Sequence, residues 1–227
     1  MKNYQIIKRM LHLAGTLVFL CTFYFAPTIV QGSNGNFGGG NGAAENPFIV
    51  EDAADLDAIH NHLTSGSEKL YYKLVQDIDL TAYLLPGGAG YAKYDTSGWL
   101  PFGQPNGENA FSGVFNGNGH TITGLWINRP EYNNIGLFGF AEAAVITNLN
   151  VELSEIGIKG KYNVGCLAGY CENGSITNCY VTEGTVKGIA QVGGLAGYTN
   201  GVSFKDCFAD IKVLGDYETG NLVGAKE

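Results

Sequence analysis

The sequence is short of positive charge. Lys and Arg together number 13 against 21 Asp and Glu, which gives a formal net charge of −8. Three of the basic residues lie in the first 32 positions, and beyond these Arg129 is the only arginine. Nucleic acids and anionic membranes are bound through clustered Lys and Arg. The composition therefore argues against nucleic acid or an anionic membrane as a partner.

Long apolar runs are also missing. The longest, residues 10–25, has about 16 residues, whereas a helix that spans a bilayer needs roughly 20. It follows a basic start, and Ala26-Pro27 and the small-residue site Val30-Gln31-Gly32 come after it, as in a secretory signal. We predict a signal peptide over 1–32, with an uncleaved anchor as the alternative. The mature protein is then secreted or on the cell surface, with no stable membrane span.

Glycine, by contrast, is abundant, with 34 residues. A short pattern that ends in glycine occurs four times: GLFG at 136–139, GCLAG at 165–169, GGLAG at 193–197 and GNLVG at 220–224. The final glycines lie 30, 28 and 27 residues apart. Such a period marks an array in which each unit buries its apolar face against its neighbours.

Aligning these repeats places apolar residues over apolar residues. Four columns result: Ile146, Ile176 and Phe204; Leu149, Cys179 and Cys207; Val151, Val181 and Ala209; and Ile158, Val186 and Val213. The first two columns are three residues apart. Because side chains alternate along a strand, an odd interval cannot keep both columns on one face, so the chain must bend between them.

Two further columns mark corners. Asn148, Asn178 and Asp206 lie at the bend, and Asn and Asp tolerate the left-handed backbone conformation that a corner needs. A second column contains only glycine: Gly160, Gly188 and Gly215. Short strands with corners in register predict an all-β fold, a parallel β-helix or solenoid.

The N-terminal half lacks the repeat. Residues 33–43 form a Gly/Asn-rich flexible lead, and 44–130 are expected to contain an N-terminal capping strand and helix followed by the first coils, ahead of the repeats at 131–227. The expected elements are a strand at 47–50, a short capping helix at 53–63, a strand at 71–80, a loop at 81–98, and a strand pair at 111–115 and 121–127 joined by an Asn-Gly turn. Leu56, Ile59, His60 and Leu63 share one face of the helix.

Four cysteines follow the signal segment, and export would allow them to form disulfides. Cys179 and Cys207 occupy equivalent positions in successive repeats, where parallel neighbours point their side chains the same way and fit disulfide torsions badly. We expect a ladder of buried thiols there. Cys166 with Cys171 is the better candidate for a bridge, and the sequence leaves open whether it forms.

Residues 44–227 resemble the GLUG-repeat proteins, bacterial surface proteins that often carry adhesin modules. The resemblance rests on AENPFIVEDAADLDAI, YYKLVQDIDL, FSGVFNGNGHTITGL and the Gly-Leu repeats. It implies a right-handed β-helix in a secreted or surface protein, adhesion as the usual role, and no catalytic residues. GLUG proteins tend to carry more repeats, and this chain stops inside its fourth.

Histidines give no sign of a metal site. GLUG units also accompany IgA-cleaving metallopeptidases, but no histidine here is followed by glutamate, which excludes the His-Glu-x-x-His zinc motif. His60 and His62 point to different sides of the expected helix, and His120 falls in the Asn-Gly turn. We therefore predict no metal site, no cofactor and no catalytic residue.

Paired acids are the remaining argument for an enzyme. Asp77 with Asp79, and Asp206 with Asp210, could suggest a polysaccharide lyase or hydrolase, because β-helices also carry those activities. Neither pair has a charged partner at the aligned position of the next repeat, so we expect the acids to cap corners. A polysaccharide-active enzyme and a structural spacer of a larger surface protein remain the alternatives.

Aromatic residues supply the candidate binding surface. Phe140, Tyr170 and Tyr198 each follow the last glycine of a repeat, and a row of rings can stack on sugars or meet a protein partner. Such rings can instead pack on the next coil. We predict an exported, non-enzymatic, adhesin-like interaction module with a glycan or extracellular protein as partner. The uncapped last coil, residues 203–224, predicts end-to-end self-association.

Overall fold

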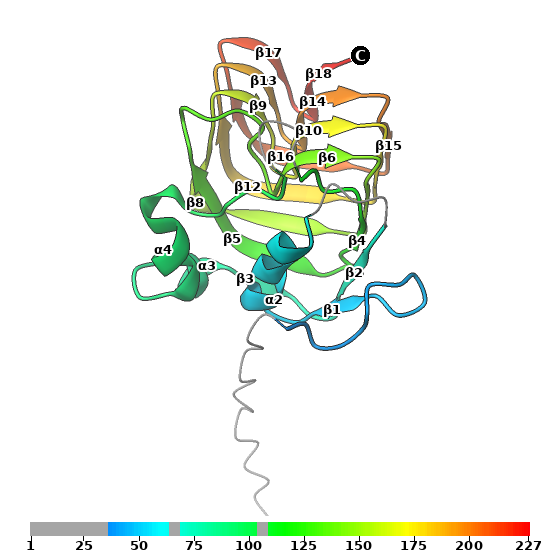
Figure 1. The fold of residues 1–227 in the computed structure, drawn as a ribbon. Helices are drawn as coiled ribbons and strands as arrows, with labels where there is room; N and C mark the ends of the chain where they lie inside the picture. The colour runs from blue at the N-terminus through cyan, green and yellow to red at the C-terminus, as the bar shows by residue number, and fades with distance from the viewer. Residues whose placement is uncertain (1–35, 64–68, 104–108) are drawn as a thin grey trace, which may run out of the picture. The chain divides into compact units, whose positions relative to one another are not determined.

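The computed structural model describes residues 36–63, 69–103 and 109–227 (Figure 1). These residues belong to one unit, Gly32–Glu227. The predicted signal peptide over 1–32 lies outside the described residues. Among the helices that the structure describes, none is long and apolar enough to cross a membrane.

Strands dominate, and every pairing between the named strands is parallel. The six-stranded sheet contains β1 (Phe48–Val50), β2 (Tyr71–Leu74), β4 (Val114–Asn116), β7 (Val145–Thr147), β11 (Ser175–Thr177) and β15 (Ser203–Lys205). The five-stranded sheet contains β3 (Ile78–Asp79), β5 (Thr121–Asn128), β8 (Asn150–Lys159), β12 (Tyr180–Lys187) and β16 (Phe208–Leu214). The three-stranded sheet contains β9 (Tyr162–Val164), β13 (Ala190–Gly193) and β17 (Tyr217–Gly220). The four-stranded sheet contains β6 (Phe138–Glu142), β10 (Ala168–Glu172), β14 (Ala196–Asn200) and β18 (Val223–Lys226).

From β6 onward the chain visits the four sheets in a fixed order. It passes from the four-stranded to the six-, five- and three-stranded sheet and then returns to the first. Each strand pairs with its equivalent in the preceding repeat, so that β6, β10 and β14 lie side by side (Figure 1). Successive repeats are therefore stacked in register, as the sequence predicted.

The registers confirm the apolar columns. Ile176 is paired with Ile146 and Phe204, Val181 with Val151 and Ala209, and Val186 with Ile158 and Val213. Within these columns, the side chains from the two complete repeats are buried, whereas those from the last repeat are partly exposed. Toward the N-terminus the core becomes aromatic, and the ring of Phe138 contacts those of Phe102, Phe111 and Phe115. The buried aromatic residues are Trp99, Phe102, Phe111, Phe115 and Phe138.

The predicted corner residues adopt the left-handed conformation. Their φ angles are 52° at Asn148, 53° at Asn178 and 50° at Asp206. The Asn178 amide Nδ2 donates to Asn148 Oδ1 at 2.8 Å, and Asn148 Nδ2 donates to Asn116 Oδ1 at 3.2 Å. The corner assignment is confirmed, and the stacked amides bond one repeat to the next.

A second left-handed column lies before the repeats' glycines, and sequence reasoning missed it. Asn134, Asn163, Gln191 and Glu218 have φ angles of 56°, 53°, 53° and 48°. Asn163 Nδ2 donates to Asn134 Oδ1 at 2.7 Å, and the Gln191 amide donates to Glu218. The mixture of Asn, Gln and Glu hides this column, because only the two asparagines are typical of a left-handed position.

The last glycine of each repeat is required by close approach of two backbones. A Cβ at Gly197 would lie 2.3 Å from the backbone nitrogen of Val164, and one at Gly169 would lie 2.3 Å from the carbonyl carbon of Asn134. The left-handed column and the glycine column therefore face each other. The second corner is confirmed too, since Gly160, Gly188 and Gly215 separate the five- and three-stranded sheets and a Cβ there would meet side chains at 2.6 to 2.8 Å.

The N-terminal half departs from the prediction in several places. The strand expected at 71–80 is two strands, β2 and β3, because the chain turns a corner between them. The strands at 114–116 and 121–128 do not pair with each other; they belong to different sheets. The loop expected at 81–98 contains α3 (Thr81–Leu84), α4 (Ala89–Tyr94) and a 3₁₀ helix, η2 (Asp95–Ser97).

The described part of the lead also differs from the expected flexible segment. Gly38 N donates to Ile49 O at 2.8 Å, and Ile49 N donates to Gly39 O at 3.0 Å. The Phe37 ring stacks on Phe48 with centroids 4.5 Å apart. Residues 36–39 are thus held against β1, because one aromatic ring within the glycine-rich stretch finds apolar partners.

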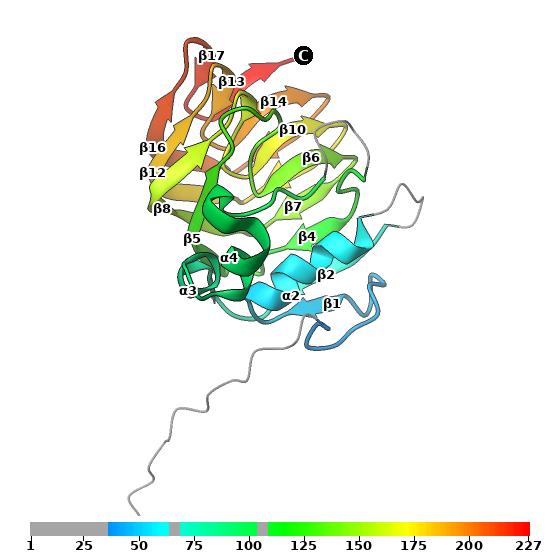
Figure 2. The ribbon, with the colours of Figure 1, turned by 60° about the vertical axis from the view of Figure 1, so that its left-hand side comes forward.

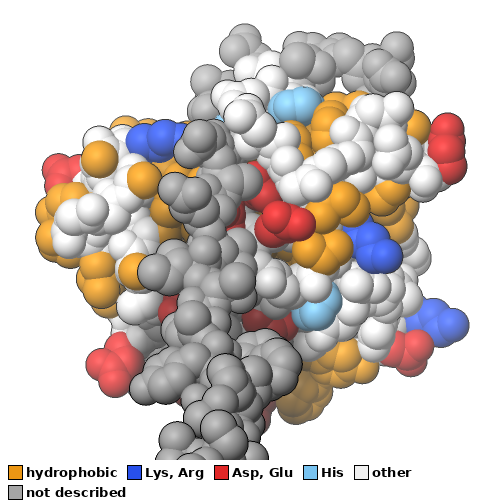
Figure 3. All heavy atoms as spheres, turned by 90° about the horizontal axis from the view of Figure 1, so that it is seen from below, with side chains coloured by type: hydrophobic (Ala, Val, Ile, Leu, Met, Phe, Trp, Pro, Cys, Tyr) orange, Lys and Arg blue, Asp and Glu red, His pale blue; other side chains and the backbone are white. Residues whose placement is uncertain are grey.

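The capping helix forms where the sequence placed it. The α-helix α2 (Ala53–Ala58) continues as the 3₁₀ helix η1 (Ile59–His62). Asp52 caps it by accepting hydrogen bonds from the backbone of Ala54 and Asp55. Leu56 and Ile59 are fully buried, so the helix lies along β1 and β2 (Figure 2). This end of the molecule exposes acidic and histidine side chains between apolar ones (Figure 3).

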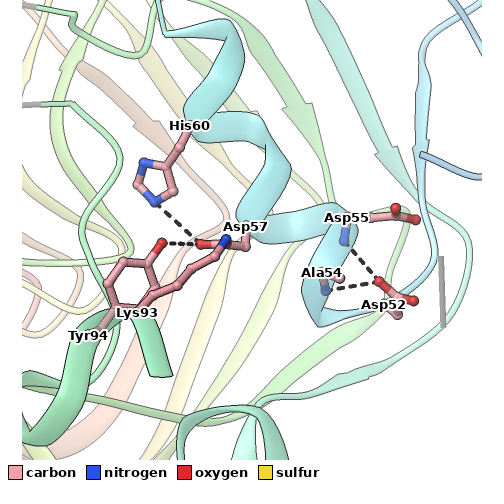
Figure 4. A network of polar contacts seen from close by, with 7 residues as sticks. All are labelled: Asp52, Ala54, Asp55, Asp57, His60, Lys93 and Tyr94. Carbon is pink, nitrogen blue, oxygen red and sulfur yellow. Dashed lines mark hydrogen bonds and ion pairs between the residues drawn. The ribbon is translucent and has the colours of Figure 1, made fainter. Parts of the chain in front are cut away.

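A buried carboxylate joins the capping helix to α4. Asp57 is 3% exposed and accepts hydrogen bonds from Lys93 Nζ and Tyr94 Oη, 36 and 37 residues away in sequence (Figure 4). His60 Nε2 lies 3.9 Å from Asp57 Oδ1. A buried charge is tolerated only when it is paired. These bonds therefore hold α4 against the capping helix.

We expect Gly197→Ala to destabilise the fold by about 3 kcal/mol, because its new Cβ meets the rigid backbone of Asn163 and Val164. Gly119→Ala is the control. Gly119 has φ +84° with open space around it, so the change costs about 1 to 2 kcal/mol from backbone conformation alone. Urea unfolding measures both. Equal losses would contradict a role for backbone contact.

We expect Asn178→Leu to cost about 2 kcal/mol or more, because leucine is unfavourable in the left-handed conformation and cannot continue the amide ladder. Thermal unfolding of the variant measures the loss. A midpoint within about 1 °C of that of the unmodified protein would overturn the structural role of this corner.

The stability of the fold should depend on pH through His60. Burial lowers the pKa of His60 to about 4, although Asp57 opposes the shift. The ordinary pKa of histidine is 6.5, so below this pH His60 binds a proton in the unfolded chain but stays neutral in the folded chain until about pH 4. Stability is therefore lost as pH falls through this window. We expect His60→Phe to reduce the stability loss between about pH 7 and about pH 4.5 by about 2 kcal/mol, measured by urea unfolding. Asn61→Ala, at an exposed position of the same helix with no titratable group, should leave that loss unchanged.

Candidate functional site

The three aromatic residues singled out from the sequence form one continuous row. Tyr170 is in register with Phe140 on one side and Tyr198 on the other. Ring centroids are 5.1 Å apart in both pairs, and the two tyrosine rings are nearly parallel, at 18°. All three side chains are half-buried on the four-stranded sheet. We call this row the aromatic stripe.

Carboxylates run beside the stripe. Glu142, Glu172 and Asn200 are paired in register two residues further along the same strands. Burial and then the carboxylates of Glu172 and Glu227 raise the pKa of Tyr170, and burial with a hydrogen bond to Glu227 raises that of Tyr198. The tyrosine hydroxyls therefore stay protonated and can donate hydrogen bonds. Rings, hydroxyl donors and carboxylate acceptors together suit a polar ligand with an apolar face.

The thiols agree with the expected ladder. All four described cysteines are unbridged, including Cys166 and Cys171, so the open question of that disulfide is answered in the negative for this structure. Cys179 is buried, and Cys207 above it is partly exposed. Burial raises the pKa of Cys171 to about 12 and also raises the pKa of Cys166. Buried thiols of this kind are unreactive packing groups.

Three of the four paired acids lie at corners, whereas Asp210 lies within β16 and is exposed, so the expectation that both pairs cap corners is wrong for Asp210. Asp77 accepts from the backbone nitrogen of Thr121 at 2.9 Å and from His120 Nδ1 at 3.2 Å, and Asp79 accepts from the backbone nitrogen of Thr81 at 2.8 Å. The bond from Thr121 lowers the pKa of Asp77, and hydrogen bonds from the side chain and then the backbone of Thr81 lower the pKa of Asp79. Within the described residues, no group of three or more His, Cys, Asp and Glu could hold a metal ion. Asp77 and Asp79 therefore act as turn caps.

The last repeat leaves strand edges unpaired. β15, β16, β17 and β18 each end their sheet within the described chain. The side chains of Phe208 and Tyr217 on these strands are 54% and 70% exposed, and a hollow of about 600 Å³ opens over Phe204 and Leu222. The geometry is compatible with the expected end-to-end self-association, which stays a prediction.

A polar cavity beside the capping helix was not foreseen. It measures about 280 Å³ and is lined by the Asp57 cluster of Figure 4 together with Asn61 and Asn109. Two buried side-chain nitrogens, His60 Nε2 and Trp99 Nε1, have no hydrogen-bond partner in the described structure. Sequence reasoning missed this cap cavity because Lys93 and Tyr94 come from a segment that was expected to be a loop.

Comparison with known proteins gives relatives but no family. No protein-family model matches the chain. It is 40% identical over 169 residues to the "Putative Gly-rich membrane protein" of Evansella cellulosilytica, covering 72% of this chain and 18% of the relative. It is 36% identical over 144 residues to "Halomucin" of Haloquadratum walsbyi, covering 63% of this chain and 2% of the relative. The chain thus spans less than a fifth of these curated relatives, whose names are those of surface-type proteins.

One solved structure shares the fold. It is titled a "putative immunoglobulin A1 protease from Bacteroides ovatus" and superimposes with a TM-score of 0.55 at 20% identity. The similarity covers 84% of this chain and 65% of that chain. At this identity the likeness establishes a shared, mostly β architecture with parallel sheets.

Proposed function

We propose that this chain is an exported, non-enzymatic, adhesin-like interaction module that binds a glycan through the aromatic stripe. Its scaffold would be a right-handed parallel β-helix of the GLUG type. The scaffold proposal is supported by four parallel sheets visited in a fixed order, with repeats stacked in register. The proposed export is supported by the names of its relatives, which are those of surface-type proteins.

The single observation that carries the binding proposal is the continuity of the stripe. Phe140, Tyr170 and Tyr198 present rings 5.1 Å apart along a direction set by the sheet. A linear ligand with repeating apolar faces can contact successive rings, while Glu142 and Glu172 accept its hydroxyl hydrogens. An extracellular protein is the other partner class that such a surface could meet.

The negative charge of the chain restricts the class of glycan that the stripe can bind. The chain has a formal net charge of −8, and carboxylates flank the stripe. An acidic polysaccharide would be repelled by these groups, so a neutral glycan fits best.

The enzymatic alternative has less support. Of the acids that could have served a lyase or hydrolase, Asp77 and Asp79 instead accept backbone hydrogen bonds at turns. A glycosidase uses two carboxyl groups that flank one bond with separate roles. The aromatic and carboxylate rows of the four-stranded sheet instead repeat the same contact from strand to strand. This arrangement favours binding of a glycan over its cleavage.

We expect the exported chain to bind neutral oligosaccharides on a glycan array, and the double variant Tyr170→Ala/Tyr198→Ala to weaken that binding by at least about tenfold. Tyr217→Ala is the matched control, because Tyr217 is 70% exposed on the three-stranded sheet, away from the stripe. Equal binding by all three proteins would refute the stripe as the binding surface. Release of new reducing ends from a bound glycan would favour the enzyme instead.

A further inference from the structure

The only arginine beyond the first 32 residues has no carboxylate partner. Arg129 directly follows β5, and its Nε donates to the carbonyl oxygen of Trp99 at 3.4 Å. None of the described residues forms an ion pair with its guanidinium group, and no aromatic ring among them makes a cation–π contact with it. Even Glu131, two residues further along the chain, forms no such pair. The terminal nitrogens of Arg129 therefore have hydrogens to donate to a group from outside this part of the chain.

An unpaired charge at this position is unfavourable. Arg129 is half-buried, and burial lowers the pKa of its guanidinium group, which nevertheless stays charged at neutral pH. Its backbone is held on both sides, because its nitrogen donates to Lys159 O at 2.9 Å and its carbonyl oxygen accepts from Tyr132 N at 3.0 Å. The chain has 21 acidic side chains, and none of those described pairs with this arginine. An external anion would supply the missing partner.

Arg129 lines a small pocket whose wall is largely apolar. Leu100, Pro101 and Ile135 form the apolar wall. Tyr132, which also lines the pocket, is 57% exposed. The pocket measures about 90 Å³, and one water molecule occupies roughly 30 Å³ in the liquid. It therefore has room for an aliphatic side chain but not for a sugar ring with its hydroxyl groups.

The pairing of one guanidinium with an apolar wall restricts the ligand. A guanidinium group binds carboxylates and phosphates through two parallel hydrogen bonds. The apolar wall favours a carboxylate that is attached to an alkyl group, because a phosphate group has no apolar part to bury. The net charge of −8 also repels a dianion more strongly than a monoanion. A carboxylate beside an aliphatic side chain is the chemistry of the last residue of a polypeptide that ends in valine, leucine or isoleucine.

We propose that this pocket, the Arg129 pocket, binds the carboxyl terminus of a partner protein whose last residue is aliphatic. The terminal carboxylate pairs with Arg129. The last side chain packs on the apolar wall, and the residue before it contacts the exposed ring of Tyr132. This goes beyond the proposed function, because the pocket uses no residue of the aromatic stripe and takes a charged peptide end instead of a neutral glycan.

The test uses the full exported chain and fluorescein-labelled peptides, with binding measured by fluorescence anisotropy. One peptide ends in valine with a free carboxylate, a second has the same sequence with a terminal amide, and a third ends in aspartate. The valine carboxylate peptide should bind saturably in the millimolar range or tighter. The amide should bind at least about tenfold more weakly, because it loses the charge-assisted hydrogen bonds. The aspartate peptide should also bind more weakly, because its side chain cannot pack on the apolar wall.

Two variants test the pocket itself. Arg129→Gln should weaken binding of the valine carboxylate peptide at least about tenfold and abolish the preference for carboxylate over amide. Lys212→Gln is the matched control, because it removes one positive charge at an exposed position of β16 and should leave both affinities unchanged. Tyr132→Ala should weaken binding about threefold. Because Tyr132 is exposed, this variant keeps the result interpretable even if the Arg129 variant folds poorly.

Several outcomes would overturn the proposal. These are failure of the valine carboxylate peptide to bind, equal binding of its amide, and a preference for carboxylate that survives Arg129→Gln. Isovalerate that binds as tightly as the peptide would identify a free organic acid as the ligand and refute a protein partner. The double variant Tyr170→Ala/Tyr198→Ala should leave peptide binding unchanged. Loss of peptide binding in that variant alone would place the peptide on the stripe and refute the Arg129 pocket.

Discussion

The close approach of two backbones at the last glycine of each repeat is the constraint on which the structure depends. At Gly169 and Gly197 the four-stranded sheet lies so near the left-handed column of the preceding repeat that no Cβ fits between them. That contact fixes where each repeat begins relative to its neighbour. Parallel pairing, the apolar columns and the amide ladders can then remain in register, because each repeat starts from the same position.

Stacking in register turns single side chains into rows, and this links the fold to the proposed function. One aromatic residue after each glycine becomes the stripe of Phe140, Tyr170 and Tyr198, and one corner asparagine becomes a ladder. The same geometry places Cys179 below Cys207 without a bridge between them. Which chemistry a row carries is then decided by one position of the repeat, largely independently of the core.

The sequence predicted the repeated columns whose residue types agree, and apart from the capping helix it failed mainly where nothing repeats or where a column mixes residue types. The columns through Ile176 and Val186, the corner at Asn178 and the stripe could be read because three copies report the same position. The short helices α3 and α4 have four and six residues, too few for a periodic signal, and occur once. Asp57 bonds to Lys93 and Tyr94 of α4, 36 and 37 positions away, so no local sequence pattern marks the cap cavity.

The aromatic stripe should therefore grow with the number of repeats, whereas the cap cavity should not. The spacing of the stripe is set by the sheet, so each added repeat with an aromatic residue after its glycine would extend it by one ring, about 5 Å further along a ligand. Contacts joined in one chain raise overall affinity through effective concentration without any stronger single contact. The cap cavity exists once, because its residues come from the capping helix and α4. If the stripe binds a glycan as proposed, a protein built this way would hold a long ligand through many weak contacts along its side.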